Sequence, residues 1–198
     1  DLLLEEIRKV RQITDSTIGV DLLLSSNFLV KGGGGGGQAP TRDDLPSEAV
    51  EGVQRIADEL GIAYAQAPET QAPVNWVPAD NSYAGAQIEV VLEEHVPVFA
   101  SGLGSPAPFK DALKANGTTI ISLVGNTRAA KRVAEGGADF VVAQGTEAGG
   151  HTGQIGTFAL LPQVMDAVAP LPVIAAGGVA SGRALAGALA LGAVGAWC

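Results

Sequence analysis

Residues 140–153 read FVVAQGTEAGGHTG, an apolar run that leads directly into a glycine-rich segment carrying His151. The β-branched and aromatic run predicts a buried strand, and the glycines that follow predict a tight turn at its end. Glycine lets the backbone approach a flat ring or a phosphate closely, and histidine exchanges protons near neutral pH. The segment therefore predicts a binding or catalytic site at the carboxyl end of a strand.

Similar apolar runs recur along the chain at a nearly constant spacing. They are continuously apolar instead of alternating, which is typical of parallel strands buried on both faces. Predicted strands span 18–24, 96–102, 118–124, 140–144, 172–178 and 193–197. Predicted helices span 2–13, 105–115, 127–135, 158–168 and 181–191. The alternation predicts an α/β fold built from βα units.

A closed barrel of such units, the (β/α)8 or TIM barrel, needs eight strands, and six are predicted here. An open parallel sheet would leave two exposed edges, which natural proteins avoid. We therefore expect an incomplete TIM barrel with strands three to eight present, and with the first two βα units and the part after the eighth strand missing. Residues 1–198 would form a single domain.

Residues 25–95 interrupt this rhythm and are interpreted as a long loop and helical excursion between strands. The segment holds the glycine run 32–37, two predicted helices at 47–60 and 83–94, and a proline-rich stretch at 67–78. A phosphate-binding glycine loop requires a helix that begins directly after it, and none is predicted there. The glycine run is therefore interpreted as a loop, and the excursion could cover the site.

Two further motifs follow the first in order. Residues 172–183 read PVIAAGGVASGR, and residues 192–197 read GAVGAW. The three motifs together, from about residue 96 to residue 198, resemble the nitronate monooxygenases, once called 2-nitropropane dioxygenases. That family consists of FMN-dependent TIM barrels. The FMN-dependent enoyl-acyl-carrier-protein reductases share these motifs, so the resemblance defines a superfamily more sharply than a substrate.

The resemblance assigns roles to individual residues. It implies that His151 is catalytic, either taking a proton or steadying a negative charge beside the flavin. It implies that the cofactor-binding residues are Asp21, Gln144, Gly149, Gly150, Gly177 and Gly178. Gly177 and Gly178 could equally form only a tight βα turn. Asp21 departs from the family, which usually has asparagine there, so burial would have to raise the pKa of this carboxyl group.

Composition limits the other classes of function. The formal net charge is -9 and no long basic run occurs, so nucleic acid and membrane surfaces are not expected as partners. One cysteine suits a reducing, cytoplasmic setting, and with two distant histidines it leaves no expected metal site. The expected partners are a small-molecule substrate, a nitronate, and dioxygen, with a homo-oligomer left open.

Three functions remain in the order of our preference. The first is FMN-dependent oxidation of alkyl nitronates by dioxygen to carbonyl compounds and nitrite. The second is an FMN-dependent NAD(P)H reductase for an enoyl-acyl-carrier-protein or a quinone. The third is a flavin-free barrel that binds a phosphorylated ligand. No residue in the sequence separates the first two.

Overall fold

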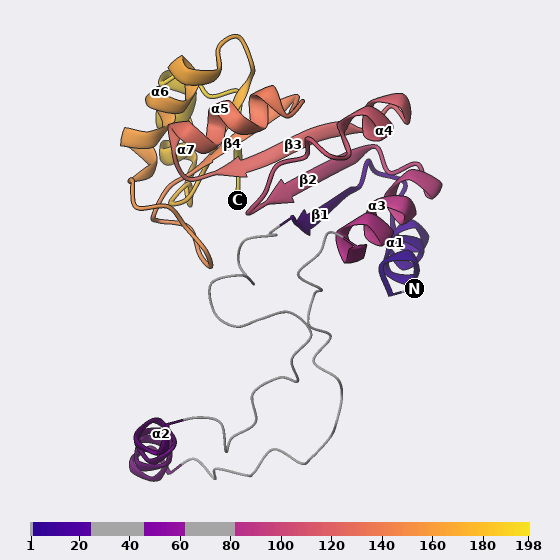
Figure 1. Cartoon of the computed structure of the whole chain (residues 1–198). Helices are drawn as coiled ribbons and strands as arrows, with labels where there is room; N and C mark the ends of the chain where they lie inside the picture. The colour runs from indigo at the N-terminus through magenta and orange to yellow at the C-terminus, as the bar shows by residue number, and fades with distance from the viewer. Residues whose placement is uncertain (1, 25–45, 62–81) are drawn as a thin grey trace. The chain divides into compact units, whose positions relative to one another are not determined.

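The computed structural model describes residues 2–24, 46–61 and 82–198. Helices and strands alternate through most of these ranges (Figure 1). The elements are α1 (Leu2–Ile13), β1 (Gly19–Leu23), α2 (Ser47–Glu59), α3 (Ser82–Glu93), β2 (Val98–Gly102), α4 (Lys110–Ala115), β3 (Thr119–Val124), α5 (Thr127–Glu135), β4 (Phe140–Gln144), α6 (Thr157–Val168), β5 (Val173–Ala176), α7 (Gly182–Ala190) and β6 (Gly195–Trp197).

The six strands form one parallel sheet in the order β1-β2-β3-β4-β5-β6. Their register is continuous: Asp21 pairs with Ala100, Ala100 with Ile121, and Ile121 with Phe140. All carboxyl ends therefore meet at one edge, as the parallel arrows of β1, β2 and β3 show in Figure 1. Sequential parallel strands joined through helices are the construction of a TIM barrel, so the predicted fold class is confirmed.

The two faces of the sheet differ in burial. On one face lie fully buried side chains such as Phe99, Ile120 and Val141, together with the buried residues Leu160 and Leu161 of α6. On the opposite face the side chains are more open, and in β1 the exposed and buried residues alternate strictly. The buried face supplies the hydrophobic core, whereas the open face is available to a ligand.

Side-chain caps mark the starts of α5 and α7. The Asn126 side chain accepts a hydrogen bond of 2.8 Å from the backbone N–H of Ala129 at the start of α5, and Ser181 caps α7 in the same way. The predicted helix 105–115 is too long, because α4 begins only at Lys110. The intervening Ser-Pro-Ala-Pro sequence explains the difference, since a residue before proline is disfavoured in helical conformation.

Part of the predicted excursion 25–95, helix α3, packs with the βα elements that form the sheet. Helix α3 packs against α1 and β1, and both Arg8 and Arg11 of α1 form salt bridges with Glu94 just after α3. The chain divides into two compact units, residues 1–28 with 80–198 and residues 29–79. Of the second unit we describe α2, where Ala57 is buried and Ile56 is exposed.

The glycine run 32–37 and the proline-rich stretch 67–78 lie outside the described residues. That the excursion covers the site stays a prediction. None of the helices in the described ranges is long and apolar enough to cross a membrane.

Candidate active site

A cavity of about 780 Å³ opens at the carboxyl edge of β1, β2, β3 and β4. It is lined by five of the residues predicted for the site, Asp21, Gln144, Gly149, Gly150 and His151. They come from β1, from β4 and from the glycine-rich loop after β4, segments that are far apart in sequence. Parallel pairing brings them together, because every strand delivers its last residues to the same edge.

The Gln144 side chain holds the loop that carries His151. Its Nε2 atom donates a hydrogen bond of 3.3 Å to the backbone carbonyl oxygen of His151. Gln144 is the last residue of β4, so the rigid sheet fixes its position. The loop is open on its other side, since a Cβ added at Gly149 or Gly150 would meet nothing within 4 Å. A flat ligand can therefore approach the backbone of these glycines.

Glu147 fastens the base of the same loop. Its Oε2 atom accepts hydrogen bonds from the backbone N–H of Thr157 at 2.9 Å and from the Thr157 hydroxyl at 3.0 Å. The backbone N–H of Thr157 lies at the start of α6, where a carboxylate is favoured by the helix dipole. This hydrogen bond is the main reason that the pKa of Glu147 is held below its ordinary value.

Gly177 and Gly178, the other predicted pair, do not line the cavity. Both have positive φ, +93° and +73°, which favours glycine. A Cβ at Gly177 would lie 2.9 Å from Thr157 Oγ1, and one at Gly178 would lie 3.1 Å from Glu147 Cβ. In the described residues this turn therefore packs behind the loop and supports it through Glu147 and Thr157.

Asp21 faces the cavity from β1 and its side chain is exposed on the open face of the sheet. Partial desolvation by the surrounding cavity walls raises the pKa of Asp21 above its ordinary value. This upward direction of the pKa shift agrees with the expectation from the sequence that burial would raise the pKa of the Asp21 carboxyl group. A carboxyl group beside the cavity can thus hold a proton more readily than an ordinary aspartate.

The cavity also contains residues that the sequence did not single out. Leu103 and Gly104, just after β2, and Arg132 of α5 complete its wall. Gly125 and Gly153 lie back to back there, since a Cβ at Gly125 would come within 2.8 Å of the Gly153 Cα. Glu147 lay within the quoted motif, and its position shortly before a predicted helix start was the signal that could have identified it.

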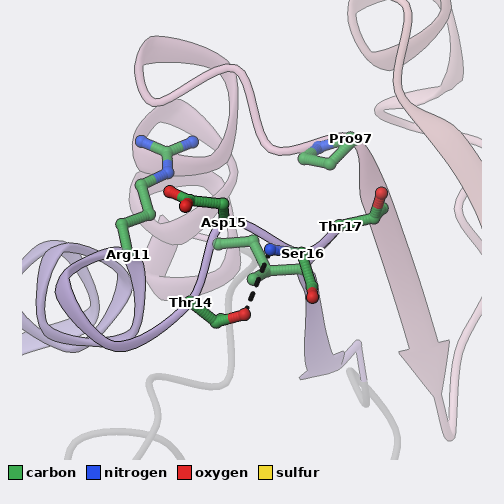
Figure 2. Close-up of a pocket in the computed structure, with 7 residues that line it drawn as sticks. Arg11, Thr14, Asp15, Ser16, Thr17 and Pro97 are labelled. Atoms are coloured by element: carbon green, nitrogen blue, oxygen red, sulfur yellow. Dashed lines mark hydrogen bonds between the residues drawn. The ribbon is translucent and has the colours of Figure 1, made fainter.

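A second hollow, of about 380 Å³, lies at the opposite, amino edge of the sheet (Figure 2). It is lined by the turn after α1, where the backbone N–H of Ser16 donates to Thr14 Oγ1 at 3.1 Å, and by Pro97 before β2. Its guanidinium, Arg11, is already paired with Glu94 at 2.6 Å. Active sites of TIM barrels lie at the carboxyl edge, so this hollow is not the candidate site.

His95 also lies at the amino edge, just before β2, where its Nδ1 atom is 2.9 Å from Asn116 Oδ1. This contact and its place at the amino edge give His95 a structural position away from the cavity. Among the side chains of the described ranges, histidine, cysteine and acidic groups form no cluster able to hold a metal ion.

A model of the nitronate monooxygenase family matches residues 1–198. A protein of Mycobacterium tuberculosis named as a monooxygenase is 39% identical over 187 residues, which cover 91% of this chain and 48% of that protein. A 5-hydroxy-7a-methyl-1-oxo-octahydro-1H-indene-4-carboxyl-CoA dehydrogenase from Rhodococcus jostii is 47% identical over 117 residues, covering 59% of this chain and 33% of that enzyme.

The fold is also found in solved structures. A nitroalkane oxidase from Streptomyces ansochromogenes superimposes with a TM-score of 0.69 and 28% identity, covering 98% of this chain and 52% of that one. The present chain thus spans about half the length of that enzyme and of the mycobacterial protein. Because the family model covers the whole chain, this protein belongs to the nitronate monooxygenase family, whose members are flavin-dependent oxidoreductases.

Proposed function

We propose that the protein oxidises alkyl nitronates with dioxygen to carbonyl compounds and nitrite, with FMN as its cofactor. One observation carries the proposal: His151 lies in the same cavity as Gln144 and the open backbone of Gly149 and Gly150. The cavity volume of about 780 Å³ lies within the range of cofactor sites. FMN would supply the electron transfer, which no side chain of the protein can perform.

The residue types that line the cavity suit the binding of a flavin. Gln144 carries both an amide donor and a carbonyl acceptor, which the polar edge of a flavin ring requires. Gly149 and Gly150 leave open space beside their backbone, where a side chain would otherwise stand. Asp21 lines the same cavity, and partial desolvation raises the pKa of its carboxyl group, which makes a negative charge there less favourable beside the ring. Together these groups would bind and orient the ring.

His151 would stabilise charge and transfer protons beside the reacting carbon. A nitronate has already lost the proton from the carbon next to the nitro group, so His151 would steady the negative charge of this substrate, whereas with a nitroalkane its imidazole could take that proton. The Gln144 side chain bonds to the backbone carbonyl oxygen of His151 and not to its ring. This bond therefore fixes the loop backbone.

The proposal is tested first on full-length protein reconstituted with FMN. Ethylnitronate and propyl-2-nitronate are supplied in air, and nitrite and carbonyl product are measured. We expect both products to form in equal amounts, with oxygen consumption. A protein that binds FMN but releases no nitrite from either nitronate would contradict the proposal.

The reductase is the second candidate, because the similar Rhodococcus jostii protein is named as a dehydrogenase of a CoA thioester. It is separated by an anaerobic experiment, in which NADH or NADPH is added to the FMN-loaded protein. Rapid loss of flavin absorbance favours the reductase, whereas resistance to both nicotinamides, with bleaching by a nitronate, favours nitronate oxidation.

The role of His151 is tested by His151→Ala. We expect FMN to remain bound while kcat for nitronate oxidation falls by about two orders of magnitude or more, in the range seen when a charge-stabilising group is lost. The matched control is His95→Ala, at the opposite edge of the sheet, which should keep its turnover. Unchanged turnover in His151→Ala would remove this residue from the mechanism.

A further inference from the structure

A further cavity of about 490 Å³ lies directly beside the candidate active site. We call it the annex. It shares Leu103, Gly104 and Arg132 with the active-site cavity, so the two hollows have part of their walls in common. Beyond these shared residues, the annex is lined mostly by apolar side chains, those of Leu24, Ala107, Pro108 and Phe109.

Leu103 stands at the junction of the two cavities in an unusual conformation. It directly follows β2 and has φ of +55°, a left-handed conformation that leucine rarely adopts. Its side chain is 42% exposed although it is large and apolar. Strained residues of this kind persist where the surrounding structure enforces them, and they concentrate at functional sites.

Gly104 explains why the strain at Leu103 does not relax. A Cβ at Gly104 would lie 2.4 Å from the carbonyl oxygen of Leu24, so the chain presses directly against the residue that follows β1. This close contact holds the turn after β2 in place. Leu103 is thereby kept at the wall that the active-site cavity and the annex share.

Arg132 supplies a positive charge at the same junction. Within the part of the chain that the structure describes, its guanidinium forms no salt bridge, although the protein carries a net charge of -9. Glu135, one turn further along α5, lines only the annex. Arg132 therefore lines both hollows, and its charge would attract an anion toward them.

We propose that the annex binds the alkyl chain of the substrate, while the anionic nitro end lies beside His151 and Arg132 attracts its charge. The substrate class is then an unbranched alkyl nitronate with an extended chain, in preference to a small one. This inference rests on the proposed function. It follows because burial of each methylene in an apolar hollow strengthens binding by about fourfold.

The test is the chain-length dependence of kcat/KM in FMN-loaded full-length protein, with primary nitronates from ethylnitronate to octylnitronate. We expect kcat/KM to rise by about two- to fourfold per added methylene until the annex is filled. Ala107→Phe places a ring in the annex and should flatten this rise. Ala112→Phe, an equally exposed change on α4 outside both cavities, should retain it.

A second pair of variants tests the charge. Arg132→Gln should lower kcat/KM for every nitronate by about tenfold or more without changing the dependence on chain length, as expected for the loss of a charged hydrogen-bonding partner. The neighbouring exposed residue Lys131 lines neither cavity, so Lys131→Gln is the matched control. An equal effect of both changes would assign the loss to overall charge and overturn the role of Arg132.

The annex is overturned if the wild-type protein shows no rise with chain length, or if Ala107→Phe keeps the same rise as Ala112→Phe. Failure of the proposed function looks different, because no nitronate of any length would then turn over. In that case the proposed role of the annex is tested by titrating the FMN-loaded protein with alkanoates from acetate to octanoate. The change in flavin absorbance measures their binding. An alkanoate affinity that rises with chain length in wild type and not in Ala107→Phe supports the annex as the site of the alkyl chain. An affinity that is independent of chain length refutes this role.

Discussion

The side chain of Gln144 and the backbone of His151 are joined by a hydrogen bond of 3.3 Å, from Nε2 to the carbonyl oxygen. The bond connects the last residue of a buried strand to the loop residue proposed to act in chemistry. A glycine-rich loop has much conformational freedom to lose, and the bond removes some of it before a ligand arrives. Gln144 therefore has a positioning role in addition to the flavin contact proposed for it.

Gln144→Ala tests this positioning. Without the amide the loop loses its tether to β4, so we expect kcat to fall by about tenfold or more through misplacement of His151. The control is Gln163→Ala, because the Gln163 side chain bonds to the Ala159 carbonyl within its own helix, α6. Steady-state kinetics with ethylnitronate measure both, and a full kcat in Gln144→Ala would show that the tether is dispensable.

Glu147 should make stability depend on acid pH. Its pKa is lowered in the folded state, mainly by the backbone hydrogen bond from Thr157. The stabilisation is therefore present above the ordinary pKa of 4.5 and is lost as pH falls through the lower folded value. Urea midpoints from about pH 6 to about pH 3 should fall more steeply in wild type than in Glu147→Gln.

Two further variants sharpen the Glu147 measurement. Glu89→Gln removes an exposed carboxylate from α3 and should retain the steep wild-type dependence on pH. Glu147→Asp keeps the charge but shortens the side chain that reaches Thr157. The pH dependence of its stability should therefore lie between those of wild type and Glu147→Gln. Parallel curves for wild type and Glu147→Gln would contradict the anchoring of the loop by this carboxylate.

Asp21→Asn should strengthen flavin binding. Desolvation raises the pKa of Asp21, so the folded protein holds the proton more tightly and stability declines as pH rises from 3.8 through the raised value. Asparagine removes this penalty and supplies a permanent amide donor. We expect the Kd for FMN at pH 7 to fall by about tenfold. Fluorescence titration of the apoprotein measures it.

The control for this experiment is Asp15→Asn, at the amino edge of the sheet, which should leave the Kd unchanged. The FMN affinity of wild type should also weaken as pH rises through the raised pKa of Asp21, whereas that of Asp21→Asn should not. An Asp21→Asn protein with unaltered affinity and pH dependence would show that this side chain does not face the flavin.

Gly177→Ala should destabilise the protein by about 1–3 kcal/mol, because alanine is strained at φ of +93° and its Cβ would lie 2.9 Å from Thr157 Oγ1. Gly85→Ala is the opposite case, since Gly85 lies within α3 with nothing near its missing Cβ, and helix propensity should stabilise it by up to about 1 kcal/mol. Urea unfolding measures both. Equal stability of the two variants would contradict the tight packing at Gly177.

Much of the fold could be predicted from local patterns. The helix predicted at 127–135 has the bounds of α5, and in the structure Asn126 caps its first turn, which is a signal local in sequence. The start of the helix at 105 was wrong, since two prolines within the predicted turn outweigh the apolar spacing. Parallel pairing followed from the continuously apolar strands.

The sequence by itself determined the alternation of strands and helices, and it predicted that His151 and Gln144 lie together at the carboxyl edge of the sheet. Only the tertiary structure decided that Gly177 packs against Thr157 and Gly178 against Glu147, and that Leu103 and Arg132 complete the wall of the cavity. The physical reason is range. Strand and helix formation depends on neighbours in sequence, whereas these contacts depend on the register of strands that the chain brings together from distant segments.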